Sequence, residues 1–208
     1  MKGVFQYQFS GLQNAWNDGL KGEAQRSAMA FCLLAFLAFG VSLALPDLRA
    51  RAVALVLDTM DGIGAVKEDG SLSALGIFSN NLRACAFTMV YGLLPFVQLP
   101  ALALGMNAML LGVLAAWYAA EGYSMLAYFA ALVPHGILEL PALILAFAMG
   151  LYVCGQLTRR CRRDESALHV WDCLVLISRM LLLVLIPLLA AAALVEAYIT
   201  PAVASLFL

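Results

Sequence analysis

The chain has 208 residues, of which 64% are hydrophobic and 12% charged, and its 12 basic and 13 acidic residues nearly cancel. This balance excludes an ordinary soluble domain, in which charged residues recur at helical spacing. No basic tract or basic-aromatic surface indicates nucleic-acid binding. We therefore predict an all-α integral membrane protein, a single polytopic membrane domain over residues 1–208 with about five transmembrane helices and the lipid bilayer as its surroundings.

The N-terminal third contains two polar segments on either side of a first span. Residues 1–26 predict a helix lying in the membrane interface, because large apolar residues recur among polar ones. The apolar stretch 27–45 is long enough to cross a hydrocarbon core of about 30 Å. Residues 46–83 predict an amphipathic extracytoplasmic segment, with a helix over 49–60 and an exposed loop over 67–71.

The remaining spans come from apolar tracts that proline and glycine interrupt, since these residues break helices. We expect spans over about 84–98, 101–120, 135–157 and 173–197. The first two form a hairpin broken at Pro95 and Pro100. A short helix precedes the span over 135–157, with a break at Pro134-His135-Gly136, and a bend is expected near Pro187.

The basic residues predict the orientation, because cytoplasmic loops are enriched in lysine and arginine. The basic cluster consists of Arg159, Arg160, Arg162 and Arg163, and Lys2, Lys21 and Arg26 precede the first span. Four crossings separate these two groups, so both can be cytoplasmic. We expect a multi-pass protein of the cytoplasmic membrane with its N-terminus in the cytoplasm and its C-terminus outside.

Three ionisable residues are expected near the outer leaflet. His135 and Glu139 are four residues apart and share one helix face, and Glu196 lies near the outer end of the last span. Ionisable groups inside a membrane indicate a functional site. One imidazole and two carboxylates form a ligand set for a divalent metal such as zinc. Alternatively, the His/Glu pair locks two helices together by hydrogen bonding, and Glu196 faces interfacial water.

Further polar residues complete the predicted site: Asn80, Asn81, Asn107 and Arg179. Asn107 lies deeper in its span than the others. The alternative interpretation of Asn80-Asn81 is a helix N-cap before the second span. The alternative for Arg179 is a side chain that extends toward the cytoplasmic interface.

Two stripes of small residues predict close helix packing. One continues the His135/Glu139 face through Ala142, Ala146 and Gly150. The other lies on the third span at Ala108, Gly112, Ala116 and Ala120. These stripes indicate that the His/Glu pair points into the bundle.

Several of these pieces, in this order, resemble the stage II sporulation protein M family. They are Phe78-Ser79-Asn80-Asn81, Asn107, Pro134-His135-Gly136 with Glu139, and Glu196-Ala197-Tyr198-Ile199-Thr200-Pro201. The resemblance covers about residues 20–205, and Ala108 departs from it where the family usually has glycine. It implies a scaffold or assembly factor of the cell envelope, because the founding member holds cell-wall hydrolases together at the membrane of spore formers. Since relatives occur in organisms that make no spores, sporulation itself need not carry over.

The resemblance assigns no reaction to the His/Glu set, and two rival functions stay open. One is a metal-dependent intramembrane hydrolase that uses His135, Glu139 and Glu196. The other is a small transporter, because two proline- or glycine-broken tracts are typical of a midplane binding site. We expect a scaffold, not an enzyme, whose partners are envelope or cell-wall-remodelling proteins; a homodimer stays open.

Overall fold

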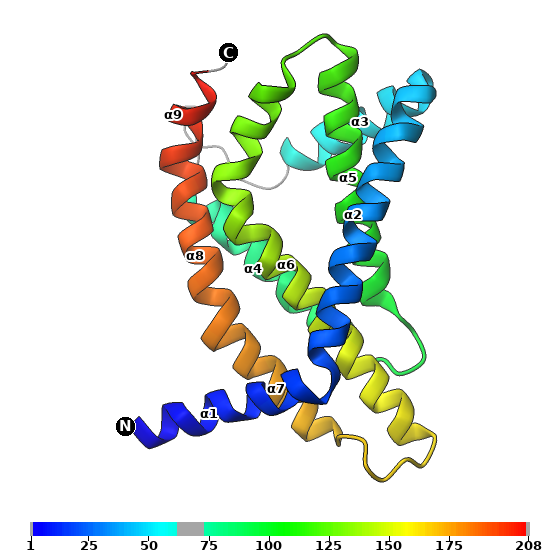
Figure 1. Cartoon of the computed structure of the whole chain (residues 1–208), viewed down its shortest axis with the longest axis vertical. Helices are drawn as coiled ribbons and strands as arrows, with labels where there is room; N and C mark the ends of the chain where they lie inside the picture. The colour runs from blue at the N-terminus through cyan, green and yellow to red at the C-terminus, as the bar shows by residue number, and fades with distance from the viewer. Residues whose placement is uncertain (1, 62–72, 207–208) are drawn as a thin grey trace. The chain divides into compact units, whose positions relative to one another are not determined.

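The structure is a computed structural model that describes residues 2–61 and 73–206. The described residues form helices and no β-strand, so the predicted all-α fold is confirmed (Figure 1). The loop predicted over 67–71 lies outside the described residues.

Nine α-helices and three π-helical turns make up the described chain. The α-helices are α1 (Lys2–Ala15), α2 (Lys21–Ala44), α3 (Pro46–Asp61), α4 (Ala74–Tyr91), α5 (Leu99–Ala120), α6 (Met125–Cys161), α7 (Val170–Met180), α8 (Ile186–Leu194) and α9 (Thr200–Ala204). The π turns are Trp16–Leu20, Leu181–Leu185 and Val195–Ile199.

Four helical stretches of the described chain are long and apolar enough to cross a membrane. They are Gln6–Ala44, Leu99–Ala120, Met125–Cys161 and Val170–Val203. The second predicted span is not among them. Its helix, α4, begins at Ala74 instead of residue 84 and so includes Asn80, Asn81 and Arg83, which lower its hydropathy.

The helix break predicted for the hairpin is present. The chain leaves α4 after Tyr91 and re-enters a helix at Leu99, so Pro95 and Pro100 mark the turn of the hairpin as expected. Helices α1 and α2 meet at a kink at Gly19, which has a φ of 139° and lies before the boundary predicted between residues 26 and 27. A residue with a Cβ rarely adopts this angle, and glycine therefore permits the kink.

The break predicted at Pro134-His135-Gly136 is wrong. Helix α6 is continuous for 37 residues and contains both Pro134 and Pro141 (Figure 1). A proline inside a helix removes one backbone hydrogen bond, whereas ending a helix leaves several polar groups unpaired. In a membrane those groups find no water, so continuing the helix costs less than breaking it.

Prolines instead coincide with π turns in the C-terminal helix. One turn ends at Leu185, two residues before Pro187, and another ends at Ile199, two residues before Pro201. A proline has no N–H for the carbonyl four residues earlier and its ring crowds that carbonyl. A π turn relieves this conflict by inserting one residue into the turn. The irregularity expected near Pro187 is therefore a local π turn.

The contacts divide the chain into two compact units, each made of three segments. Unit 1 comprises Met1–Met29, Leu82–Leu104 and Pro141–Leu188. Within it, the buried Gly150 lies against α4 and α5, because an added Cβ would come within 2.7 Å of the Thr88 carbonyl and 2.8 Å of Pro100. Helix α1 lies against α7, where Arg179 bonds Gln8. The expected stripe at Gly150 is thus a packing surface.

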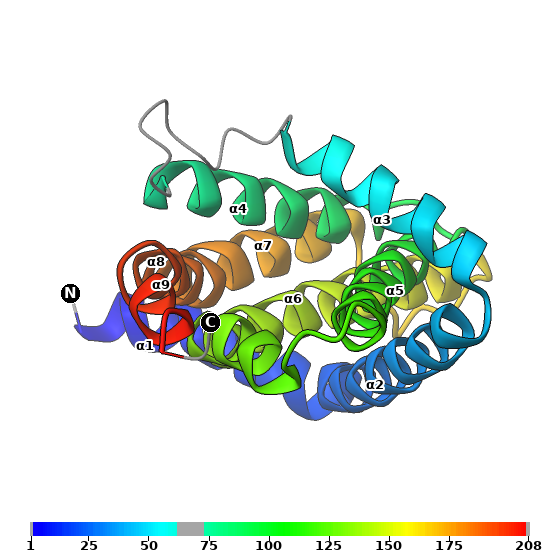
Figure 2. The same ribbon diagram turned by 90° about the horizontal axis from the view of Figure 1, so that it is seen from above.

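Unit 2 comprises Ala30–Asn81, Gly105–Leu140 and Leu189–Leu208. The other stripe packs here: Ala108 and Ala116 are fully buried, and an added Cβ at Gly112 would meet the α2 backbone, 2.8 Å from Phe39 N. In both views α9 lies beside the N-terminal part of α6 (Figures 1 and 2). This pairing brings the C-terminal helix to the His/Glu face.

Candidate metal centre

His135 and Glu139 occupy successive turns of α6 within unit 2. Because side chains four residues apart share a helix face, both point to the same side, and their side chains are 14% and 18% exposed. His135 Nε2 lies 4.0 Å from Glu139 Oε2. This separation is too long for a hydrogen bond, so His135 and Glu139 do not hydrogen-bond each other.

Glu196 reaches the same place from the C-terminal helix. It lies in the π turn Val195–Ile199, which Pro201 follows. One ligand atom from each of His135, Glu139 and Glu196 lies within 4.8 Å of the other two. We call these three residues the His/Glu/Glu cluster.

The contacts of Thr200 indicate which tautomer His135 adopts. The Thr200 hydroxyl donates to the Val195 carbonyl at 3.3 Å, and its oxygen lies 3.3 Å from His135 Nδ1. Because the single hydroxyl proton is used on Val195, the oxygen accepts a hydrogen bond from Nδ1–H. We therefore assign the proton of the neutral imidazole to Nδ1, which leaves the lone pair of Nε2 on the side of Glu139.

Among the asparagines of the predicted site, Asn81 makes a direct contact with the cluster. Its side chain hydrogen-bonds the Glu139 carboxylate. Asn80 is half-buried in α4, and Asn107 is half-buried in α5. The N-cap interpretation of Asn80-Asn81 is wrong, because α4 begins a full turn or more earlier. There, Ser73 Oγ accepts a hydrogen bond from the Gly76 N–H at 3.1 Å.

Arg179 belongs to unit 1 and has its own partners on α1. Its Nε donates to Gln8 Oε1 at 2.7 Å, and its guanidinium carbon lies 5.5 Å from the centre of the Tyr7 ring. Gly11 leaves room for this side chain, since an added Cβ would lie 2.8 Å from Arg179 Cζ. Arg179 thus joins α1 to α7.

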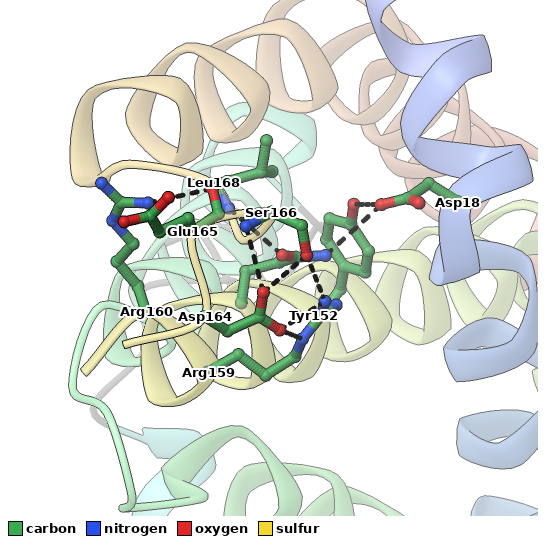
Figure 3. Close-up of polar contacts among 9 residues, drawn as sticks. Asp18, Tyr152, Arg159, Arg160, Asp164, Glu165, Ser166 and Leu168 are labelled. Atoms are coloured by element: carbon green, nitrogen blue, oxygen red, sulfur yellow. Dashed lines mark hydrogen bonds and ion pairs between the residues drawn. The ribbon is translucent and has the colours of Figure 1, made fainter. Parts of the chain in front are cut away.

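Unit 1 also contains polar groups that are paired with one another (Figure 3). Tyr152 donates a hydrogen bond to Asp18 Oδ2 at 2.9 Å, and Gln156 donates to the same oxygen at 3.4 Å. Gln156 in turn accepts from the Leu168 N–H at 3.3 Å. This chain of bonds ties the kink at Gly19 to α6 and to the loop before α7.

A second set of hydrogen-bonded polar side chains holds the loop after α6, and Figure 3 shows it beside the first set. Arg159 Nε donates to Asp164 Oδ2 at 2.8 Å, and Ser166 Oγ donates to Asp164 Oδ1 at 2.6 Å. The hydrogen bond from Ser166, and then that from Arg159, lower the pKa of Asp164. Part of the predicted basic cluster is therefore engaged in holding this loop.

The hydrogen-bonded carboxylates of unit 1 and the His/Glu/Glu cluster of unit 2 differ in what they can do chemically. Each contact around Asp18 and Asp164 joins a donor to an acceptor, and these contacts hold segments of unit 1 together. The His/Glu/Glu cluster brings together one imidazole lone pair and two carboxylates, which are all acceptors. Such a set is stabilised by a cation: protons or a divalent metal.

Sequence reasoning missed Thr200, Asp18, Tyr152 and Gln156. A signal existed for Thr200, because it stands four residues after Glu196 and hence near the same helix face. Tyr152 and Gln156 also have this spacing on α6. Asp18 carried no such signal, since its position depends on the kink at Gly19.

Comparison with known families identifies the family to which this chain belongs. The family described as stage II sporulation protein M matches residues 28–201, which include most of α2, the helices from α3 to α8 and the whole His/Glu/Glu cluster. Curated proteins and solved structures yield no significant match. Because the family match covers well over half of its length, this chain is a member of the stage II sporulation protein M family.

Proposed function

We propose that the protein is a scaffold or assembly factor in the cytoplasmic membrane, with its N-terminus in the cytoplasm, that organises cell-wall-remodelling proteins of the envelope. Family membership and the four membrane-length helices support this proposal. The arginines at the end of α6 support the orientation, because such residues favour the cytoplasmic side.

The function that the geometry supports best is binding of a divalent metal, zinc above others, by the His/Glu/Glu cluster. The observation that carries it is the approach of three acceptor atoms to within 4.8 Å of one another. Zinc ligands lie about 2.0–2.2 Å from the ion, so small side-chain rotations bring these atoms into range. Nδ1–H bonded to Thr200 leaves Nε2 as the ligand atom, which is the usual outer-shell arrangement of a metal-bound histidine.

A bound ion would connect α6 to the C-terminal helix. His135 and Glu139 belong to α6, and Glu196 belongs to the π turn before α9. Metal binding would therefore hold these helices together at the outer end of unit 2. A rigid surface there would suit a scaffold that binds other proteins.

Metal analysis of the purified protein tests this proposal. Protein prepared in detergent without chelators should contain about one zinc ion per chain, the stoichiometry of a single site. Glu196→Gln should lose it, whereas Glu121→Gln, at an exposed turn residue, should keep it. A metal-free parent protein that does not take up added zinc would overturn the proposal.

The scaffold and its orientation need separate experiments. In a cysteine-free background, Ser124→Cys should react with an impermeant reagent added outside the cell, and Glu165→Cys should not; both positions are exposed. Cell-wall hydrolases should co-purify with the full chain after crosslinking in cells. The reverse labelling pattern, or the absence of every such hydrolase, would contradict this part of the proposal.

A further inference from the structure

A polar pocket of about 630 Å³ lies within unit 1, between α1 and α7. Its lining includes Tyr7, Asn14, Asp18, Trp171, Asp172 and Arg179. The volume falls within the range of about 300–1,000 Å³ typical of small-molecule sites. We call it the α1–α7 pocket.

Two carboxylates of this pocket have acceptor capacity left. Asp18 Oδ2 accepts from Tyr152 and Gln156, and Asp172 Oδ2 accepts from the His169 N–H at 3.2 Å. Among the described residues, the Oδ1 atoms of Asp18 and Asp172 make no hydrogen bond. These hydrogen bonds orient both carboxylates and leave one oxygen of each able to accept a hydrogen bond from a ligand.

Arg179 gives the pocket one positive charge. Its Nε bonds the neutral side chain of Gln8, and in the part of the chain that the structure describes no carboxylate lies within 4.0 Å of its nitrogens. An arginine held in place without an acidic partner is a ready ligand for a phosphate, which its guanidinium can bind through two parallel bonds.

An apolar groove of about 440 Å³ adjoins the pocket. The two share Trp171, Val175 and Arg179, and the groove continues past Leu182 and Leu183. These leucines lie in the membrane-length stretch Val170–Val203. A polar pocket that opens into an apolar groove along a membrane helix matches an amphiphile, with its polar end in the pocket.

We propose that the α1–α7 pocket and its groove bind a phospholipid with an ethanolamine headgroup. Arg179 binds the phosphate, the free oxygens of Asp18 and Asp172 accept N–H bonds from the ammonium, and an acyl chain lies along the groove. With two acidic groups and one basic group, the pocket disfavours a lipid whose headgroup carries only negative charge. A choline headgroup has no N–H to donate. Trp171, 74% exposed, suits the interface where headgroups meet chains.

Native mass spectrometry of the full chain in detergent tests the proposal. The probes are dioleoyl lipids with ethanolamine, choline or glycerol headgroups, and soluble phosphoethanolamine. The ethanolamine lipid should be retained on the order of tenfold better than the other two, the difference expected from charge-assisted hydrogen bonds. Phosphoethanolamine alone should bind weakly, because it lacks the chain that fills the groove.

Variants assign the effect to this site. Asp18→Asn should reduce retention of the ethanolamine lipid toward that of the choline lipid, and Trp171→Ala, at a surface position, should weaken all three. Glu165→Gln is the control and should behave like the parent. The proposal is overturned if the glycerol lipid binds best, if choline binds as well as ethanolamine, if phosphoethanolamine binds as well as the lipid, or if both variants retain lipid like the parent. It is independent of zinc, so its failure leaves the metal site untouched.

Discussion

The polar groups of the two units are arranged on opposite principles. In unit 1, Asp18 is paired with Tyr152 and Gln156, and Asp164 with Arg159 and Ser166, so each carboxylate has donors from the protein. In unit 2, His135 Nε2, Glu139 and Glu196 turn acceptor atoms toward one another. Asn81 supplies one donor to Glu139.

This difference separates carboxylates that are hydrogen-bonded within the protein from a cluster of acceptors. A carboxylate that already accepts hydrogen bonds from the protein needs no metal ion, whereas lone pairs gathered in a poorly hydrated place need a cation. The contrast predicts that changes in the His/Glu/Glu cluster alter metal binding and that equivalent changes in unit 1 do not.

The largest expected effect is on zinc affinity when a ligand is removed. His135→Ala should weaken zinc binding more than about 100-fold, because loss of an outer-shell partner alone costs about 10–100-fold. Titration of chelator-treated protein with zinc chloride measures this. Asp18→Asn, the matched change in unit 1, should leave the affinity unchanged; equal losses in both variants would remove the distinction between the units.

A change in helix packing compares the two units without altering a metal ligand. Gly112→Ala places a Cβ 2.8 Å from Phe39 N and should destabilise the protein by about 1–3 kcal/mol, as overpacking does. Gly155→Ala, which meets nothing within 4 Å, should be neutral or stabilising by about 0.5–1 kcal/mol. Thermal unfolding in detergent compares them, and identical melting curves would show that α5 does not pack on α2 there.

The orientation of His135 predicts a smaller effect. Thr200→Val removes the acceptor of Nδ1–H and should weaken zinc binding about 10–100-fold, while Thr200→Ser should retain it. If valine and serine variants bind zinc equally, Thr200 does not set the tautomer.

The smallest effect concerns pH and the loop of unit 1. The pKa of Asp164 is lower in the folded loop than the unfolded value of about 3.9. The carboxylate therefore stabilises the loop at neutral pH, and this contribution is lost as pH falls below about 4 through the folded pKa. A spin label at Glu165→Cys should become more mobile in that range. With Asp164→Asn added, the label should be mobile at every pH; a label insensitive to both changes would contradict the assignment.

Much of the site could be predicted because its components obey local rules. The four-residue spacing of His135 and Glu139 places them on one face of any helix, and the stripes at Gly112 and Gly150 indicate buried faces without reference to the partner helix. Charge placement and proline breaks then predict that Glu196 lies at the same depth.

The other features could not be predicted, because local sequence preferences competed there with the energetics of the whole fold. Pro134 favours a break, but the cost of unpaired backbone groups in a membrane keeps α6 continuous. Asn80-Asn81 suits an N-cap, but the helix extends back to Ser73, where a serine performs that role. The bond from Asn81 to Glu139 required the fold, because no sequence spacing relates α4 to α6.

The central claim is that the acceptor-only cluster of unit 2 holds a metal ion, and X-ray absorption at the zinc edge tests it most directly. The purified, zinc-loaded protein should show one nitrogen ligand from His135 and oxygen ligands from Glu139 and Glu196 at about 2.0–2.2 Å, and Glu196→Gln should change that shell. Sulfur ligands at about 2.3 Å would place the metal on cysteines. That result, or a zinc spectrum unchanged by Glu196→Gln, would contradict the account.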